Sequence, residues 1–144
     1  MTPLFNIRIT MEQLRSRYSL AILALLIVAG MAGNWFTFTL FFNVDLIFGS
    51  IFALLALQLL GWRRGVVAAF FIGSVTWVIW NHPWAMFIQS AEVAVTAWLM
   101  QRKKLSLVLA DALYWLLVGV PLVWLFYWLV MQIPMESTVL IMLK

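Results

Sequence analysis

The basic residues of this chain fall only at a few short breaks between long apolar stretches. The other breaks, at residues 37–45, 81–84 and 132–136, contain no lysine or arginine. In polytopic membrane proteins, lysine and arginine are enriched in the loops on the cytoplasmic side. The alternation therefore predicts a chain that crosses a membrane several times, with its N-terminus in the cytoplasm. The basic clusters are Arg8, Arg15 and Arg17; Arg63 and Arg64; Arg102, Lys103 and Lys104; and Lys144.

The composition agrees with a membrane location. Of the 144 residues, 66% are hydrophobic and 10% are charged, whereas a soluble domain is about half apolar and about a quarter charged. The core of a soluble domain of this size could not bury so many apolar side chains, so we expect lipid to cover many of them. Because the basic residues lie at the ends of the apolar stretches, the net charge of +4 fixes topology and does not indicate nucleic-acid binding.

The residue inventory argues against an enzyme whose active site lies within these residues. The chain has no cysteine and a single histidine, His82, so thiolate chemistry and a multi-histidine metal site are excluded. Phosphate-binding loops and the usual hydrolase and zinc-peptidase motifs do not occur in the sequence. We therefore expect no catalytic residues, no metal and no cofactor.

The pattern of apolar runs predicts an all-α fold, a bundle of five spanning helices in one domain over residues 18–144. Residues 1–17 form a basic cytoplasmic or interfacial arm, and residues 137–144 read as the start of a sixth helix that is cut short. The second, third and fourth helices are short for a hydrocarbon core of roughly 30 Å, which predicts a cavity on the outer side. The expected helices are 18–36, 45–60, 66–80, 84–100 and 105–133.

Glu92 is the most informative side chain, because a carboxylate in the middle of a spanning helix costs roughly 2.5–3.5 kcal/mol. Gln89 and Thr96 lie three residues before it and four after it, so all three share one helix face. That face must look into the bundle. It has two interpretations: a ligand contact or protonatable switch, and an interhelical hydrogen bond that fixes packing.

Polar residues also mark the outer ends of the first two helices. Asp45 opens the expected second helix, where an acidic residue caps free N–H groups and suits the helix dipole; a ligand contact is the alternative. Asn34 and Asn43 flank the same region and are weaker candidates for a site.

Aromatic residues gather at the outer ends of the third and fourth helices. Trp77 and Trp80 are three residues apart on one face, and Asn81, His82 and Trp84 follow. One interpretation is an interfacial aromatic belt. The other is an aromatic box, a group of rings that stack on a flat or apolar ligand, with His82 and Asn81 hydrogen-bonding to the polar edge of that ligand.

Two residues of the fifth helix stand out. Asp111 lies shortly after the basic cluster at 102–104, which predicts a salt bridge or a helix-start charge. Pro121 should kink this helix.

Parts of the chain resemble the N-terminal membrane region of bacterial histidine kinases and cyclic-di-GMP enzymes, a sensory module likened to vitamin-uptake proteins. The similar stretches include residues 44–57, 60–66 and Trp80-Asn81-His82-Pro83-Trp84. This resemblance implies a sensor of the bacterial inner membrane. The implied partners are the bilayer, a small-molecule ligand, a cytoplasmic signalling domain in the same chain, and a second copy in a homodimer.

The helix layout is also similar to the substrate-binding subunits of energy-coupling-factor vitamin transporters. That resemblance implies an outer-facing pocket near Asn34, Asp45, Trp80 and His82. Those subunits dock their partner through small residues four apart near the cytoplasmic part of the first helix, and residues 18–25 contain no such pair. We therefore expect a sensor that binds a small, flat or apolar ligand through Glu92, Gln89 and the outer residues; a transporter subunit is the alternative.

Overall fold

The computed structural model describes residues 18–36, 38–39, 45–46 and 48–132. The expected basic arm at 1–17, Asn43 and the expected start of a sixth helix at 137–144 lie outside these residues. The described chain is helical apart from one pair of two-residue strands, so the all-α class is confirmed.

Helix α2 (Ser19–Trp35) is followed by strands β1 (Phe38–Thr39) and β2 (Asp45–Leu46), which pair antiparallel with Thr39 opposite Asp45. Helix α3 (Gly49–Leu60) comes next. The prediction that Asp45 opens this helix is wrong, because the backbone of Asp45 lies in a strand and the helix begins four residues later.

Helix α4 (Trp62–Trp80) follows α3 after a single residue, Gly61. Gly61 has φ +90°, a left-handed conformation that glycine adopts without steric cost. One residue in this conformation is enough to reverse the chain, so the expected turn over residues 61–65 is shorter than predicted. Residues 62–65 form the first turn of α4 instead.

Helix α5 (Trp84–Lys103) begins directly after Pro83, as expected for a proline at a helix start, and ends at Lys104 in the left-handed region. The last helical segment has four parts: α6 (Leu107–Tyr114), the π-helical turn η2 (Trp115–Gly119), α7 (Val120–Leu125) and the π-helical turn η3 (Phe126–Val130). Ser106 caps the start of α6 by accepting a hydrogen bond from the Leu109 N–H.

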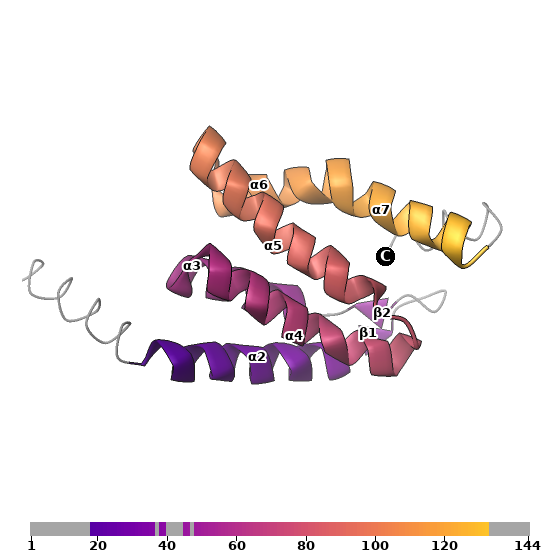
Figure 1. Ribbon diagram of the computed structural model, residues 1–144, viewed down its shortest axis with the longest axis horizontal. Coiled ribbons are helices and arrows are strands. Elements are labelled where there is room, and N and C mark those ends of the chain that lie inside the picture. Colours follow the sequence, from indigo (N-terminus) through magenta and orange to yellow (C-terminus); the bar gives the residue numbers. More distant parts are fainter. Residues whose placement is uncertain (1–17, 37, 40–44, 47, 133–144) are drawn as a thin grey trace, which may run out of the picture.

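The helices lie side by side along the long axis of the molecule, with α2 at one edge and the α6–α7 segment at the other (Figure 1). Helices α2, α3 and α4 pack against one another, α5 packs on α4, and α6 packs on α5. The core between them is built mainly from small residues, among them Ala53, Ala56, Ala68, Ala69 and Ala97. Small side chains let helix backbones approach closely, as is common in membrane bundles.

Among the described helices, two are long and apolar enough to cross a membrane: α4 and the segment Leu107–Val130. Helices α2 and α3 are apolar but shorter. The 12 residues of α3 extend for about 18 Å, well short of a hydrocarbon core of roughly 30 Å. The lengths therefore give two candidate spans, and the expected five crossings remain a prediction.

Candidate functional site

The polar face of α5 points into the bundle, as its spacing predicts. Gln89 is 3% exposed, Glu92 is 1% exposed and Thr96 is fully buried. Several of their polar atoms have no hydrogen-bond partner among the described residues: both amide atoms of Gln89, the Thr96 hydroxyl and Glu92 Oε2. Buried polar groups in proteins are normally paired. Gln89, Glu92 and Thr96, which we call the α5 polar row, are unusual in this respect.

Glu92 joins three elements through one oxygen. Its Oε1 accepts hydrogen bonds from the Ser50 hydroxyl on α3 and from the Trp115 indole Nε1, at 3.1 Å, on η2. Ser50 is 42 residues away in sequence and Trp115 is 23 residues away. The carboxyl group is thus the point at which α3, α5 and the last helical segment meet.

Asp111 lies beside Glu92. The two carboxyl groups are close enough to interact electrostatically, and no N–H or O–H group of the described residues reaches Glu92 Oε2 or Asp111 Oδ1. An ionised carboxylate only accepts hydrogen bonds, so a bond between two carboxyl groups requires a proton on one of them. We therefore expect the pair to share one proton.

This position of Asp111 differs from the prediction, which paired it with the basic cluster at 102–104 or placed it as a helix-start charge. Asp111 and Trp115 are four residues apart and so lie on one helix face, which meets Glu92. That spacing shows in the sequence that Asp111 and Trp115 share a face, but it does not identify Glu92 as their partner. Tyr114, next along the chain, is fully buried and donates its hydroxyl to the Ile88 carbonyl at 2.8 Å, which ties the same two helices together.

A second group of residues, the outer aromatic cluster, lies where the α4–α5 turn meets the end of the last segment. Phe126 is its centre: the His82 ring lies 4.9 Å from it, and the Trp84 ring stacks on it at 4.7 Å. Tyr127 contacts His82 edge-on at 6.2 Å. His82 Nδ1 and Trp84 Nε1 are buried without a partner among the described residues. Desolvation lowers the pKa of His82 below 6.5, partly offset by a backbone hydrogen bond.

The outer residues named from the sequence are only partly brought together. Trp80 lies 6.1 Å from the His82 ring and so joins the cluster. Trp77 is 53% exposed and Asn81 is also exposed, and the ring contacts that join His82, Trp84, Phe126 and Tyr127 do not include Trp77. Phe126 and Tyr127 were not singled out from the sequence, because an aromatic residue in an apolar helix carries no local sign of its partner.

Asn34 is buried, and both ends of its amide are used by the backbone. Its Oδ1 accepts the Gly49 N–H at 2.8 Å and its Nδ2 donates to the Ile72 carbonyl at 3.0 Å. Asn34 therefore supplies, from α2, the cap for α3 that was predicted from Asp45. It also ties α2 to α4, and this geometry favours a structural role.

Within the described part of the chain, no group of three or more His, Asp or Glu side chains is placed to hold a metal ion. Searches against protein-family models, curated proteins and solved structures each find no match to this chain.

Proposed function

We propose that this chain is the sensory domain of a multi-pass protein of the bacterial cytoplasmic membrane. In this proposal five helices cross the bilayer, the N-terminus is cytoplasmic, and a small ligand binds in the outer half of the bundle. Binding is passed to a cytoplasmic output domain. The proposal assigns ligand contact to the α5 polar row and to the outer aromatic cluster.

The membrane placement is supported by the outer surface of the helices. Large apolar side chains are exposed along the described helices, and a soluble protein rarely shows contiguous apolar surface on this scale. The breaks at Arg63–Arg64 and at 102–104 lie at one end of the bundle, and the strands and the α4–α5 turn lie at the other (Figure 1). Five examples between 65% and 78% exposed are Leu20, Val28, Val78, Val108 and Leu116.

The observation that carries the ligand proposal is the set of unpartnered atoms on the α5 polar row. In a low-dielectric interior, a buried polar group without a partner costs roughly 1–3 kcal/mol. A purely structural helix contact gives no reason for an amide, a hydroxyl and a carboxyl oxygen on one face to lack partners among the described residues. A ligand with hydrogen-bonding groups would satisfy them.

The route for the ligand follows α5. Trp84, in the outer aromatic cluster, is eight residues before Glu92, which corresponds to about 12 Å along a helix. A flat or apolar ligand would stack at the cluster and extend a polar group toward Gln89 and Glu92. Because Glu92 bonds to α3 and η2, a ligand that competes for its carboxyl group would favour a different arrangement of α5 and the last segment, and so shift the population between two states.

Native mass spectrometry of the full chain in nanodiscs tests this proposal. We expect a stoichiometric small molecule on the wild-type protein and a loss of at least about tenfold in its occupancy in Glu92→Gln, as for the loss of a hydrogen bond to a charged group. Ser90→Ala is the matched control, because the Ser90 hydroxyl bonds only within α5, to the Met86 carbonyl. A clean apo mass for the wild type in nanodiscs and in mild detergent contradicts the proposal.

A further inference from the structure

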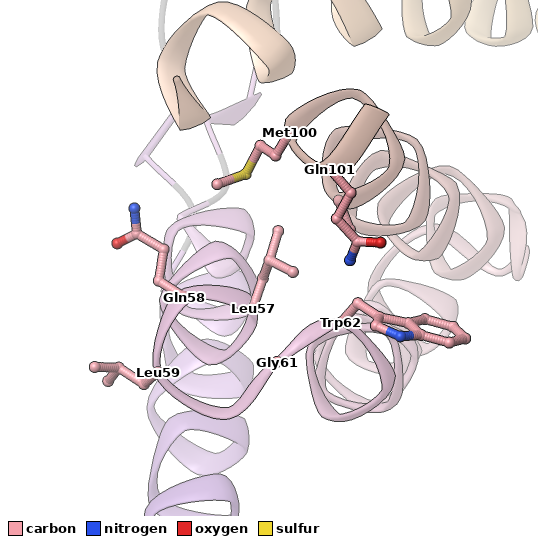
Figure 2. Close-up of a pocket in the computed structure, with 8 residues that line it drawn as sticks. Leu57, Gln58, Leu59, Gly61, Trp62, Met100 and Gln101 are labelled. Carbon is pink, nitrogen blue, oxygen red and sulfur yellow. The ribbon is translucent and has the colours of Figure 1, made fainter. Parts of the chain in front are cut away.

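A cavity of about 540 Å³ opens at the end of the bundle where the α3–α4 turn meets the last turns of α5. The sequence led us to expect a cavity on the outer side, whereas this one lies at the opposite, basic end. In Figure 2 the side chains of Leu57, Met100 and Gln101 point into the space between α3 and α5, and that of Leu59 points away from it. The lining residues are Leu57, Gln58, Leu59, Gly61, Trp62, Ala97, Met100 and Gln101.

The lining has an apolar and a polar part. Leu57 and Ala97 are buried and form the floor. Gln58, Gln101 and Trp62 are exposed and carry side-chain N–H donors at the mouth. A volume of this size falls within the range of small-molecule sites, roughly 300–1,000 Å³, and the mixture suits a molecule with a polar head and an apolar body.

The surroundings of the cavity are basic. Arg63 and Arg64 follow the lining residue Trp62, and the Arg63 guanidinium lies 5.5 Å from the centre of the Trp62 ring. The basic run 102–104 follows the lining residue Gln101. The stretches 57–67 and 97–108 contain no acidic residue, so nothing in them neutralises this charge.

The backbone adds to the positive potential. Helix α4 begins at Trp62, inside the lining, and the first N–H groups of a helix are unpaired and carry partial positive charge. Helix N-termini with nearby basic side chains are favourable sites for phosphate groups.

We propose that this cavity holds an anionic phospholipid of the cytoplasmic leaflet, with its phosphate at the arginines and the start of one acyl chain on the Leu57–Ala97 floor. Basic pockets between membrane helices on the cytoplasmic side bind anionic headgroups. The inference rests on the membrane placement proposed above and is independent of the ligand site at Glu92. The lipid would bridge α3, α4 and α5 at the end nearest the expected output domain.

The test is native mass spectrometry of the full chain in detergent, titrated with dioctanoyl phosphatidylglycerol or dioctanoyl phosphatidylcholine. We expect one saturable phosphatidylglycerol adduct, with phosphatidylcholine at least about tenfold weaker. The double substitution R63Q/R64Q should weaken phosphatidylglycerol binding about 30-fold, since each basic residue near an anionic headgroup contributes a factor of about five.

The matched control is R15Q/R17Q, which removes the same number of arginines on the same expected side but far in sequence from the residues that line the cavity. It should change binding by less than about threefold. Gln101→Leu keeps a side chain of similar size but removes a hydrogen-bond donor from the mouth of the cavity, so it should also weaken phosphatidylglycerol binding. Circular dichroism and a single gel-filtration peak verify that each variant is folded before it is titrated.

Three outcomes overturn the proposal. Equal weakening by the two double substitutions would mean general attraction to the basic surface. Equal binding of the two lipids would mean that the net negative charge of the headgroup is not recognised. Full competition by inorganic phosphate would identify a site for a free anion that does not use the apolar floor.

Discussion

At the scale of single residues, the most unusual feature is a pair of carboxyl groups, the buried Glu92 and the half-buried Asp111, with no ion pair to a basic side chain among the described residues. Glu92 and Asp111 face each other, and the other titratable group beside them among the described residues is Tyr114, from the same segment as Asp111. The Ser50 hydroxyl and the Trp115 indole complete the surroundings of Glu92. Two ionised carboxylates at this separation would repel each other, so we expect them to share one proton and to carry a single negative charge.

We predict an infrared carbonyl band of a protonated carboxylic acid at neutral pH in the wild-type protein. Glu92→Gln and Asp111→Asn should each remove it, because an amide donates the hydrogen bond that the shared proton supplied and the remaining carboxylate stays ionised. Asp45→Asn, a change outside the pair, should leave the band in place. A wild-type spectrum without the band would contradict the shared proton.

His82 gives the folded protein a dependence on pH. Desolvation lowers its folded-state pKa below the 6.5 of the exposed side chain, so the unfolded chain binds the proton more readily. The contribution to stability is fully present above pH 6.5 and is lost as pH falls toward the lower pKa of the folded state.

The melting temperature should therefore fall between pH 7.5 and pH 5.5, approximately the range in which a histidine titrates. His82→Phe keeps a ring against Phe126 but cannot bind a proton, so its fall over that range should be smaller. Thermal unfolding in detergent at the two pH values measures the difference. The same fall in both proteins would show that His82 does not contribute.

At the scale of elements, α4 and α5 approach each other so closely that one position on α4 has room only for glycine. A Cβ added to Gly73 on α4 would lie 2.7 Å from the Met86 Cα on α5, whereas one added to Gly33 on α2 would have its nearest neighbour at 3.5 Å, an ordinary contact. The α4–α5 contact therefore leaves no room for a methyl group, and it is the contact that positions the α5 polar row.

Gly73→Ala should lower the free energy of unfolding by roughly 1–2 kcal/mol, the cost of overpacking less the gain in helix propensity. Gly33→Ala is the matched control and should be neutral or stabilise by up to about 1 kcal/mol. Denaturant titration in detergent micelles compares the two. Equal destabilisation by both changes would show that the α4–α5 distance is not limiting.

The last helical segment departs from a regular α-helix where Pro121 predicts a kink. The π-helical turn η2 ends two residues before Pro121. Proline has no N–H to bond back along the helix, and π-helical turns are often found at functional sites. Here the turn carries Trp115, the residue that donates to Glu92.

At the scale of the whole molecule, the proposed topology puts Asn81 outside and Gln101 inside. The absence of cysteine makes single-cysteine labelling possible without background. Asn81→Cys in intact cells should react with a membrane-impermeant maleimide, and Gln101→Cys should react only after the membrane is permeabilised. The reverse pattern would invert the orientation, and labelling of both without permeabilisation would contradict a crossing between them.

The helices could be predicted from the sequence because their signals are local. Apolar runs bounded by glycine, proline or basic residues predict α2 and the start of α5 to within a residue. The period of 3.6 residues likewise predicts that Gln89, Glu92 and Thr96 share one inward face. The start of α3 was predicted too early, because residues 45–46 pair with a strand and the cap comes from Asn34, fifteen residues before Gly49.

The sequence by itself therefore determined which segments are helical, which end of the bundle is basic and which face of α5 is buried. The tertiary structure alone decided what that face meets: Ser50, Trp115 and Asp111 at Glu92, and Phe126 against His82 and Trp84. Helical periodicity fixes the direction in which a side chain points, because it depends on neighbours within a turn or two. The partner depends on how helices far apart in the sequence pack, and no local pattern encodes that.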